Sequence, residues 1–160
     1  MTSLRLGRLD VEIAGAELTL FGRIDDAAAL GGLLDRIGHG EVTIDTDGVS
    51  FVNSIGMREW IRLIRGLRDR GDTVVLTRVA DVLMAQLNMI SELKEKVRIA
   101  SFHAQYVCAA CGAESAPVVD VAAHAASLAK MVAPRLPCPE CGAPMDLGDF
   151  PERYLLIFKT

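Results

Sequence analysis

Residues 42–89 read VTIDTDGVSFVNSIGMREWIRLIRGLRDRGDTVVLTRVADVLMAQLNM. The apolar positions at the beginning of this stretch predict a strand over 41–52, interrupted by a turn at Asp47-Gly48. A helix should follow and end at Gly71, and an apolar strand over 73–79 and a short helix over 80–90 should come next. Strands that alternate with helices in this way are typical of an α/β layer with parallel crossovers.

The helix expected between residues 53 and 71 has two different faces. Its apolar face carries Met57, Trp60, Ile61, Ile64 and Leu67, and the opposite face carries Arg58, Arg62, Arg65 and Asp69. The only tryptophan is therefore predicted to lie in the core. The arginines have two interpretations, which are an ordinary solvated face and a surface that docks an acidic partner.

The segments on either side of this stretch complete a sheet. Residues 8–15 and 17–24 alternate apolar and polar side chains around Gly15, which predicts an antiparallel hairpin. Asp25 and Asp26 are candidate N-caps for a helix over 27–37, and 96–102 should be the last strand. The predicted fold class is α/β, a mixed sheet with helices packed on one side, followed by a small C-terminal unit.

Composition places the chain among ordinary folded proteins. Of its 160 residues, 51% are hydrophobic and 24% are charged, and the formal net charge is −4. Residues 1–8 do not resemble a secretory signal, and no apolar run approaches the roughly 20 residues that span a bilayer. We therefore expect a cytoplasmic protein without membrane contact.

Every cysteine lies beyond residue 107, which suggests a domain boundary nearby. We predict one domain over 1–103 and a zinc-ribbon domain with a helical insert over 104–160. No flexible linker separates them, because RIASFHAQYVC, residues 98–108, predicts one continuous strand that runs from one unit into the other.

Two Cys-x-x-Cys-Gly motifs form the chemical signature of the second unit. They are Cys108-Ala-Ala-Cys111-Gly and Cys138-Pro-Glu-Cys141-Gly. Tight turns of this kind point two thiolates inward, and two such turns complete a tetrahedral site for one structural zinc ion. The intervening segment is long for such modules, and VVDVAAHAASLAKMVA, residues 118–133, predicts a helix that fills it.

Other roles for the four cysteines remain open at this stage. A four-thiolate site also suits iron. Disulfides are disfavoured in a reducing compartment, a redox motif would need one reactive pair, and catalytic zinc would need an open coordination position. His103 and His124 could replace a cysteine ligand, although no spacing recommends either of them.

The stretch from Glu41 to Met89 resembles the STAS domain, the family named for sulfate transporters and anti-sigma factor antagonists. The pieces that carry the resemblance are VTIDTDGV, SFV, NSIGM, REWIRLIRGLRDRG, TVVLT and DVLMAQLNM. Residues 17–37 are similar to the early strand and first helix of the family, so the likeness covers about residues 8–100. It implies a small mixed sheet with helices on one side.

The resemblance also implies a functional turn before the long helix. In antagonists of this family a partner kinase, which doubles as an anti-sigma factor, phosphorylates the second serine of that turn. Ile55 occupies this position here, while Asn53, Ser54 and Gly56 match the family's aspartate, first serine and glycine. Ser54 remains a candidate phosphoacceptor, and its alternative role is the N-cap of the helix.

These observations favour a non-enzymatic bacterial signalling or scaffold protein. Its partner surface would comprise Asn53, Ser54, Ile55, Gly56, Arg58, Arg62 and Arg65, and its partner a serine kinase, an anti-sigma factor or a larger assembly. No catalytic residue set emerges from the sequence. The alternative is a nucleic-acid-binding regulator that reads through the ribbon, but residues 104–160 carry four basic residues against six acidic ones. Self-association and a small ligand remain open.

Overall fold

The computed structural model describes all 160 residues, and its largest element is a six-stranded mixed sheet with the order β1-β2-β3-β4-β5-β6. The strands β1, β2 and β3 are antiparallel neighbours, whereas β3 to β6 are parallel to one another. Their bounds are β1 Thr2–Leu6, β2 Leu9–Ala14, β3 Glu17–Ile24, β4 Glu41–Val52, β5 Thr73–Thr77 and β6 Arg98–Ile99. The α/β fold class predicted from the sequence is confirmed.

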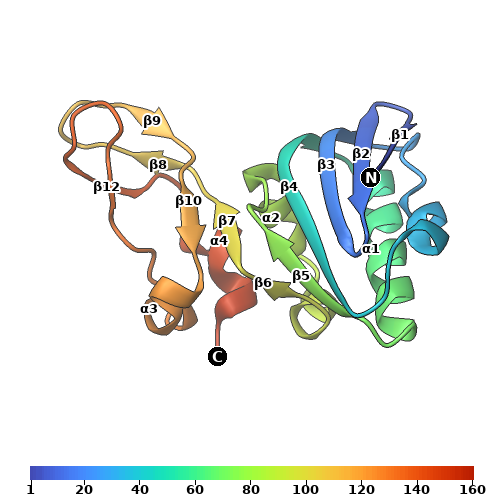
Figure 1. Ribbon diagram of the computed structural model, residues 1–160. Coiled ribbons are helices and arrows are strands. Elements are labelled where there is room, and N and C mark those ends of the chain that lie inside the picture. Colours follow the sequence, from blue (N-terminus) through green and yellow to red (C-terminus); the bar gives the residue numbers. More distant parts are fainter.

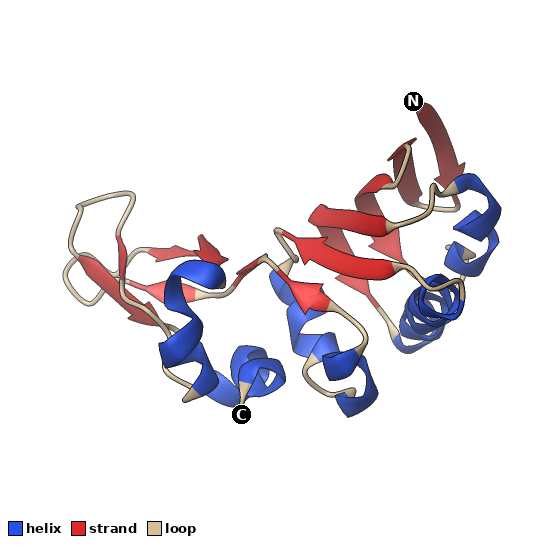
Figure 2. Ribbon diagram, turned by 60° about the horizontal axis from the view of Figure 1, so that its bottom comes forward, coloured by secondary structure: helices blue, strands red, loops and turns tan.

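The helices of this part lie together on one face of the sheet (Figure 2). They are η1 Leu30–Arg36, α1 Ser54–Asp69, α2 Asp81–Leu87 and η2 Ser91–Glu95, where η denotes a 3-10 helix. Parallel strands that follow one another in sequence and in space need crossovers of one hand, and right-handed crossovers place every connecting helix on the same side.

The core lies between this sheet and its helices. The apolar face of α1 carries Trp60, Leu63 and Ile64, which are fully buried, and β4 contributes Val42 and Ile44 to the same buried cluster. The predicted apolar face of α1 is thus confirmed, including the burial of the only tryptophan, except that Ile61 is only partly buried. Its opposite face is exposed.

Two details of this sheet differ from the sequence-based expectation. The Asp47-Gly48 pair does not form a turn, because β4 continues through it. Thr19 pairs with Asp45 and Phe21 with Gly48. Between these two pairs β3 advances by two positions and β4 by three, so β4 has one extra residue that bulges out of the pairing. The bulge moves the buried face from even to odd positions, which explains the burial of Val49 after Ile44.

The helix expected over residues 27–37 is shorter and of the 3-10 type. It begins only at Leu30, because the Asp25 carboxylate accepts a hydrogen bond from the Ala27 amide and holds a turn there. Gly31 and Gly32 further weaken an α-helix at this place. The C-terminal carbonyls of η1 are instead bound by Arg70, which donates to the carbonyls of Leu34, Ile37 and Gly38.

The C-terminal part forms a lobe of short strands beside the sheet (Figure 1). Its elements are β7 Ser101–His103, β8 Tyr106–Val107, β9 Glu114–Ser115, β10 Val118–Asp120, η3 Ala122–His124, α3 Ala125–Ala129, β11 Leu136–Pro137, β12 Pro144–Leu147, α4 Pro151–Leu155 and η4 Leu156–Phe158. The strands β11, β12, β8 and β9 form one small sheet, and β7 pairs with β10.

Two expectations about this part are wrong. Residues 98–108 form three short strands instead of one, because β6 pairs with β5, β7 with β10, and β8 with β9 and β12. Residues 118–133 are only partly helical, because the β-branched start, Val118 and Val119, pairs with β7 as a strand. The helical portion is confined to η3 and α3.

The predicted boundary between residues 103 and 104 stays a prediction. The buried cluster continues across this position, from Phe102 through Tyr106 to Tyr154. The rings of Phe102 and Phe158 lie 5.3 Å apart between centroids. The last helical segment, coloured red in Figure 1, therefore returns to the sheet part and lies against α2.

Candidate metal centre and docking surface

The two Cys-x-x-Cys-Gly motifs fold into two turns of the same construction. The Gly112 amide donates to the Cys108 carbonyl at 2.8 Å, and the Gly142 amide donates to the Cys138 carbonyl at 2.9 Å. Both glycines have positive φ angles, 75° and 78°, which other residues adopt only with strain. The sequence prediction of paired turns is therefore realised in detail.

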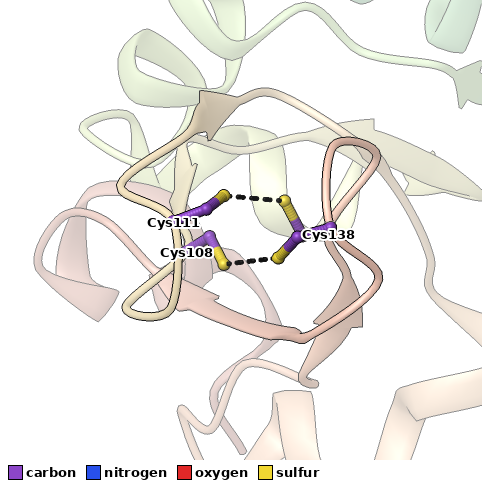
Figure 3. A group of neighbouring side chains, drawn as sticks. Cys108, Cys111 and Cys138 are labelled. Carbon is purple, nitrogen blue, oxygen red and sulfur yellow. Dashed lines mark hydrogen bonds between the residues drawn. The ribbon is translucent and has the colours of Figure 1, made fainter.

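The four sulfur atoms converge on one point (Figure 3). Their Sγ atoms all lie within 4.8 Å of one another. The Cys108 and Cys141 sulfurs are 3.5 Å apart, and those of Cys111 and Cys138 are 3.7 Å apart. A tetrahedral ion with metal–sulfur bonds of about 2.3 Å requires sulfur–sulfur edges of about 3.8 Å, so the cluster has the dimensions of a metal site.

The surroundings of the sulfurs favour some thiolates and oppose others. The backbone N–H of Cys111 is the largest influence that lowers the pKa of the Cys108 thiol, to about 7. At Cys111 the amide of Ala113 favours the thiolate, but the neighbouring Cys141 sulfur and burial together raise the pKa to about 12. Four thiolates so close together repel one another, and a bound cation removes that repulsion.

This arrangement can hold a divalent ion but leaves no position for a substrate. Four protein sulfurs fill a tetrahedral coordination sphere, which is the pattern of structural sites. Neither sulfur pair lies near the roughly 2.05 Å of a disulfide bond, and the cysteines are free. His103 and His124 are not members of the cluster.

The turn before α1 brings four of the predicted partner-binding residues together. Asn53 is the N-cap, since its side-chain oxygen accepts a hydrogen bond from the Gly56 amide at 2.8 Å. The alternative role of Ser54 as the cap is therefore wrong, and its exposed side chain makes no hydrogen bond within the chain. Ile55 is 50% exposed, whereas Gly56 is buried.

Gly56 shapes this turn without facing solvent. A Cβ atom at this position would lie 1.9 Å from the carbonyl oxygen of Ile24, at the end of β3. Only glycine lets the start of α1 approach the sheet this closely. Any contribution of Gly56 to a partner surface is therefore indirect.

The three predicted arginines line a groove between α1 and η1. Its volume is about 510 Å³, and its lining residues are Leu34, Arg58, Ile61, Arg62, Arg65, Gly66 and Asp69. Arg62 pairs with Glu59 of its own helix, and Arg65 pairs with Glu92 of η2, but Arg58 has no ion-pair partner. The sequence pattern identified these arginines, whereas the contribution of η1 depends on the tertiary fold.

A polar junction between the sheet and the C-terminal part was not foreseen from the sequence. The Nε2 atom of His103 lies 2.5 Å from the Asp47 carboxylate, and its Nδ1 lies 2.6 Å from the Ala116 carbonyl oxygen. Arg78 binds Asp45 through two nitrogens and lies 3.4 Å from Asp47. This chain of contacts ties the bulged part of β4 to the loop between β9 and β10.

Comparison with known proteins adds no assignment. A scan against protein-family models finds no match, and a search of curated proteins finds none. The helices of the chain are all too short or too polar to cross a membrane.

Proposed function

We propose that this chain is a non-enzymatic signalling or scaffold protein that docks an acidic partner protein through the first turns of α1. The ribbon would hold one structural zinc ion and extend the folded surface. The resemblance of residues 41–89 to STAS domains supports a partner of the serine kinase or anti-sigma factor type, and it supports a bacterial origin. A cytoplasmic location, where thiols stay reduced, fits the four free cysteines.

The exposed start of α1 is the observation that carries the docking proposal. Ile55 offers an exposed apolar side chain, and Arg58 and Arg62 follow it one and two turns later on the exposed face. Apolar contact surrounded by positive charge suits a partner that presents an apolar pocket with acidic rims. The unpaired state of Arg58 leaves its charge available to such a partner.

The position of Ser54 supports regulation of the same surface by phosphorylation. Its hydroxyl is exposed and free of hydrogen bonds, at the first position of a 16-residue helix. A phosphate at a helix N-terminus is stabilised by the helix dipole and adds negative charge beside Arg58. Phosphorylation of Ser54 would thereby weaken the attraction of an acidic partner.

Zinc is the metal that fits this proposal best. Its preferred geometry with four thiolates is tetrahedral and closed, and it carries no redox chemistry that a scaffold would have to manage. Iron in the same site would give a redox-active centre, which the proposed role does not use.

Photo-crosslinking tests the docking proposal. A photoreactive amino acid at position 55 should crosslink one protein in cells of the source bacterium, identified by mass spectrometry as a serine kinase or an anti-sigma factor. The matched control is position 132, because Val132 is 55% exposed in the C-terminal part and is close to Ile55 in exposure.

Charge reversal identifies the contact. Arg58→Glu and Arg62→Glu should each reduce crosslinking at least about tenfold. Arg8→Glu is the control, since Arg8 is an exposed arginine without an ion-pair partner in the turn between β1 and β2. The docking proposal is wrong if both α1 variants crosslink as well as Arg8→Glu, or if position 132 captures the same protein equally well.

A further inference from the structure

A second groove lies between the sheet part and the C-terminal end, away from the arginines of α1. Its volume is about 440 Å³. The lining residues come from the α2–η2 region and from η4 with the residues after it, and they are Leu87, Asn88, Ile90, Ser91, Lys94, Leu156, Ile157, Lys159 and Thr160. Figure 1 shows these two segments, green and red, side by side at the centre of the molecule.

The floor of this groove is apolar, and hydrogen bonds of one side chain, Asn88, hold its two walls in place. Leu87, Ile90, Leu156 and Ile157 supply its apolar side chains. Asn88 holds the two walls together, because its side-chain oxygen accepts from the Ile157 amide at 2.8 Å. The Asn88 side-chain nitrogen also donates to the Met84 carbonyl at 2.7 Å, which fixes the orientation of the amide. The groove is therefore preformed.

Two lysines of the groove lining have no carboxylate within ion-pair distance. Lys94 donates to the backbone carbonyl of Lys159, and both residues line the groove. Neither lysine has a carboxylate partner, although the chain carries a formal net charge of −4. The neighbouring Lys96, by contrast, lies 4.0 Å from Glu92. Two lysines without an ion-pair partner give this groove a charge that suits an anionic ligand.

We propose that this groove binds a single-chain anionic amphiphile, with its alkyl chain on the apolar floor and its carboxylate beside Lys94 and Lys159. Preformed apolar grooves with a few convergent polar groups are the usual form of small-molecule sites. The groove volume of about 440 Å³ lies within the range of small-molecule pockets, about 300–1,000 Å³. The half-exposed Leu156 would be covered by the ligand.

Binding at this place would stabilise the contact between the two parts of the molecule. The ligand would contact η2 on one side and η4 on the other, so it favours the state in which the C-terminal segment is docked. The site is separate from the α1 surface, and the proposal stands whether or not that surface docks a partner.

Calorimetric titration of the full, metal-loaded chain with dodecanoate tests the proposal. We expect saturable binding of one dodecanoate per chain, and binding of neutral dodecanol at least about tenfold weaker, because the alcohol lacks the charge that the lysines attract. In the unsubstituted protein, dodecanoate should shift the amide resonances of Leu87, Asn88 and Leu156 and leave those of α1 unchanged.

Matched variants localise the ligand. The double change Lys94→Glu with Lys159→Glu, and the single change Leu156→Asp, should each weaken binding at least about tenfold. Lys130→Glu and Val132→Asp are the controls, because both residues are exposed and outside the groove. The proposal is overturned if no saturable binding occurs at about 1 mM dodecanoate, if dodecanol binds equally well, or if the groove variants bind like the controls.

Discussion

The sheet part, up to His103, and the ribbon part, from Ala104 onward, differ in how many buried apolar residues they contain. Most of the 37 residues in the buried cluster belong to the sheet and its helices. Those beyond His103 are only Ala104, Tyr106, Cys108, Val119, Leu128, Cys138, Met145, Tyr154 and Leu155, and two of these nine are cysteines of the cluster. Burial of apolar surface stabilises the first part, whereas the ribbon has strands of only two to four residues, and we expect it to depend on a metal ion held by the four cysteines.

The largest effect should come from breaking the four-cysteine cluster. Cys138→Ser should abolish hydrogen-exchange protection in residues 104–147 and leave the sheet protected, because binding of a structural metal supplies about 10–16 kcal/mol in small zinc modules. Ala109→Ser is the matched control, since Ala109 is exposed within the first cysteine turn. Equal protection of the ribbon in both variants would contradict the difference between the two parts.

A large effect in the sheet part should come from packing alone. Gly56→Ala places a Cβ atom 1.9 Å from the Ile24 carbonyl oxygen, and relieving this overlap should cost about 1–3 kcal/mol of unfolding free energy. Gly32→Ala meets no atom within 4 Å and serves as the control. Urea unfolding measures both changes. Equal stability of the two variants would show that the start of α1 does not pack as closely as described.

A smaller effect should follow loss of the helix cap. Asn53→Ala removes the hydrogen bond to the Gly56 amide and should destabilise the protein by about 1 kcal/mol. Ser54→Ala should change the stability by less than about 0.5 kcal/mol, because the Ser54 hydroxyl makes no hydrogen bond within the chain. The reverse order in thermal unfolding would mean that Ser54 is the cap.

The smallest effect concerns acid stability of the sheet part. Burial opposes the charged form of Asp72, but the Gly40 amide and Arg70 outweigh it, and the pKa of this carboxyl is lowered. A lowered folded-state pKa contributes stability above the unfolded value of about 3.9, and this contribution is lost as the pH falls through the folded value.

The corresponding measurement compares Asp72→Asn with the unsubstituted protein. Between about pH 5 and pH 2, the unfolding free energy of the variant should fall less steeply than that of the unsubstituted protein. Parallel pH dependences in the two proteins would assign the acid sensitivity to other carboxyl groups.

The sequence predicted those features that depend on neighbouring residues. Periodicity located α1 and its buried face, and the spacing of the cysteines located the four-cysteine cluster. The bulge in β4, the three short strands from residue 98 and the strand β10 could not be predicted, because each depends on which distant strand is available for pairing. The groove at Lys94 and Lys159 likewise joins residues about 65 positions apart.

The capping of α1 shows how a local pattern can still mislead. Asn53 and Ser54 are both residue types favoured at the N-cap, and the pattern predicts Ser54 as the cap whereas the structure has Asn53 there. The choice follows from the close approach of Gly56 to Ile24, which sets where the helix begins. Ser54 is thereby left free for the modification that we propose.

The most direct test of the central claim is the metal content of the protein purified without added zinc. Elemental analysis combined with native mass spectrometry should find one zinc ion per chain, and no thiol should react with a thiol reagent until the ion is removed. Less than about half an equivalent of any metal, together with four reactive thiols, would contradict the account of the ribbon.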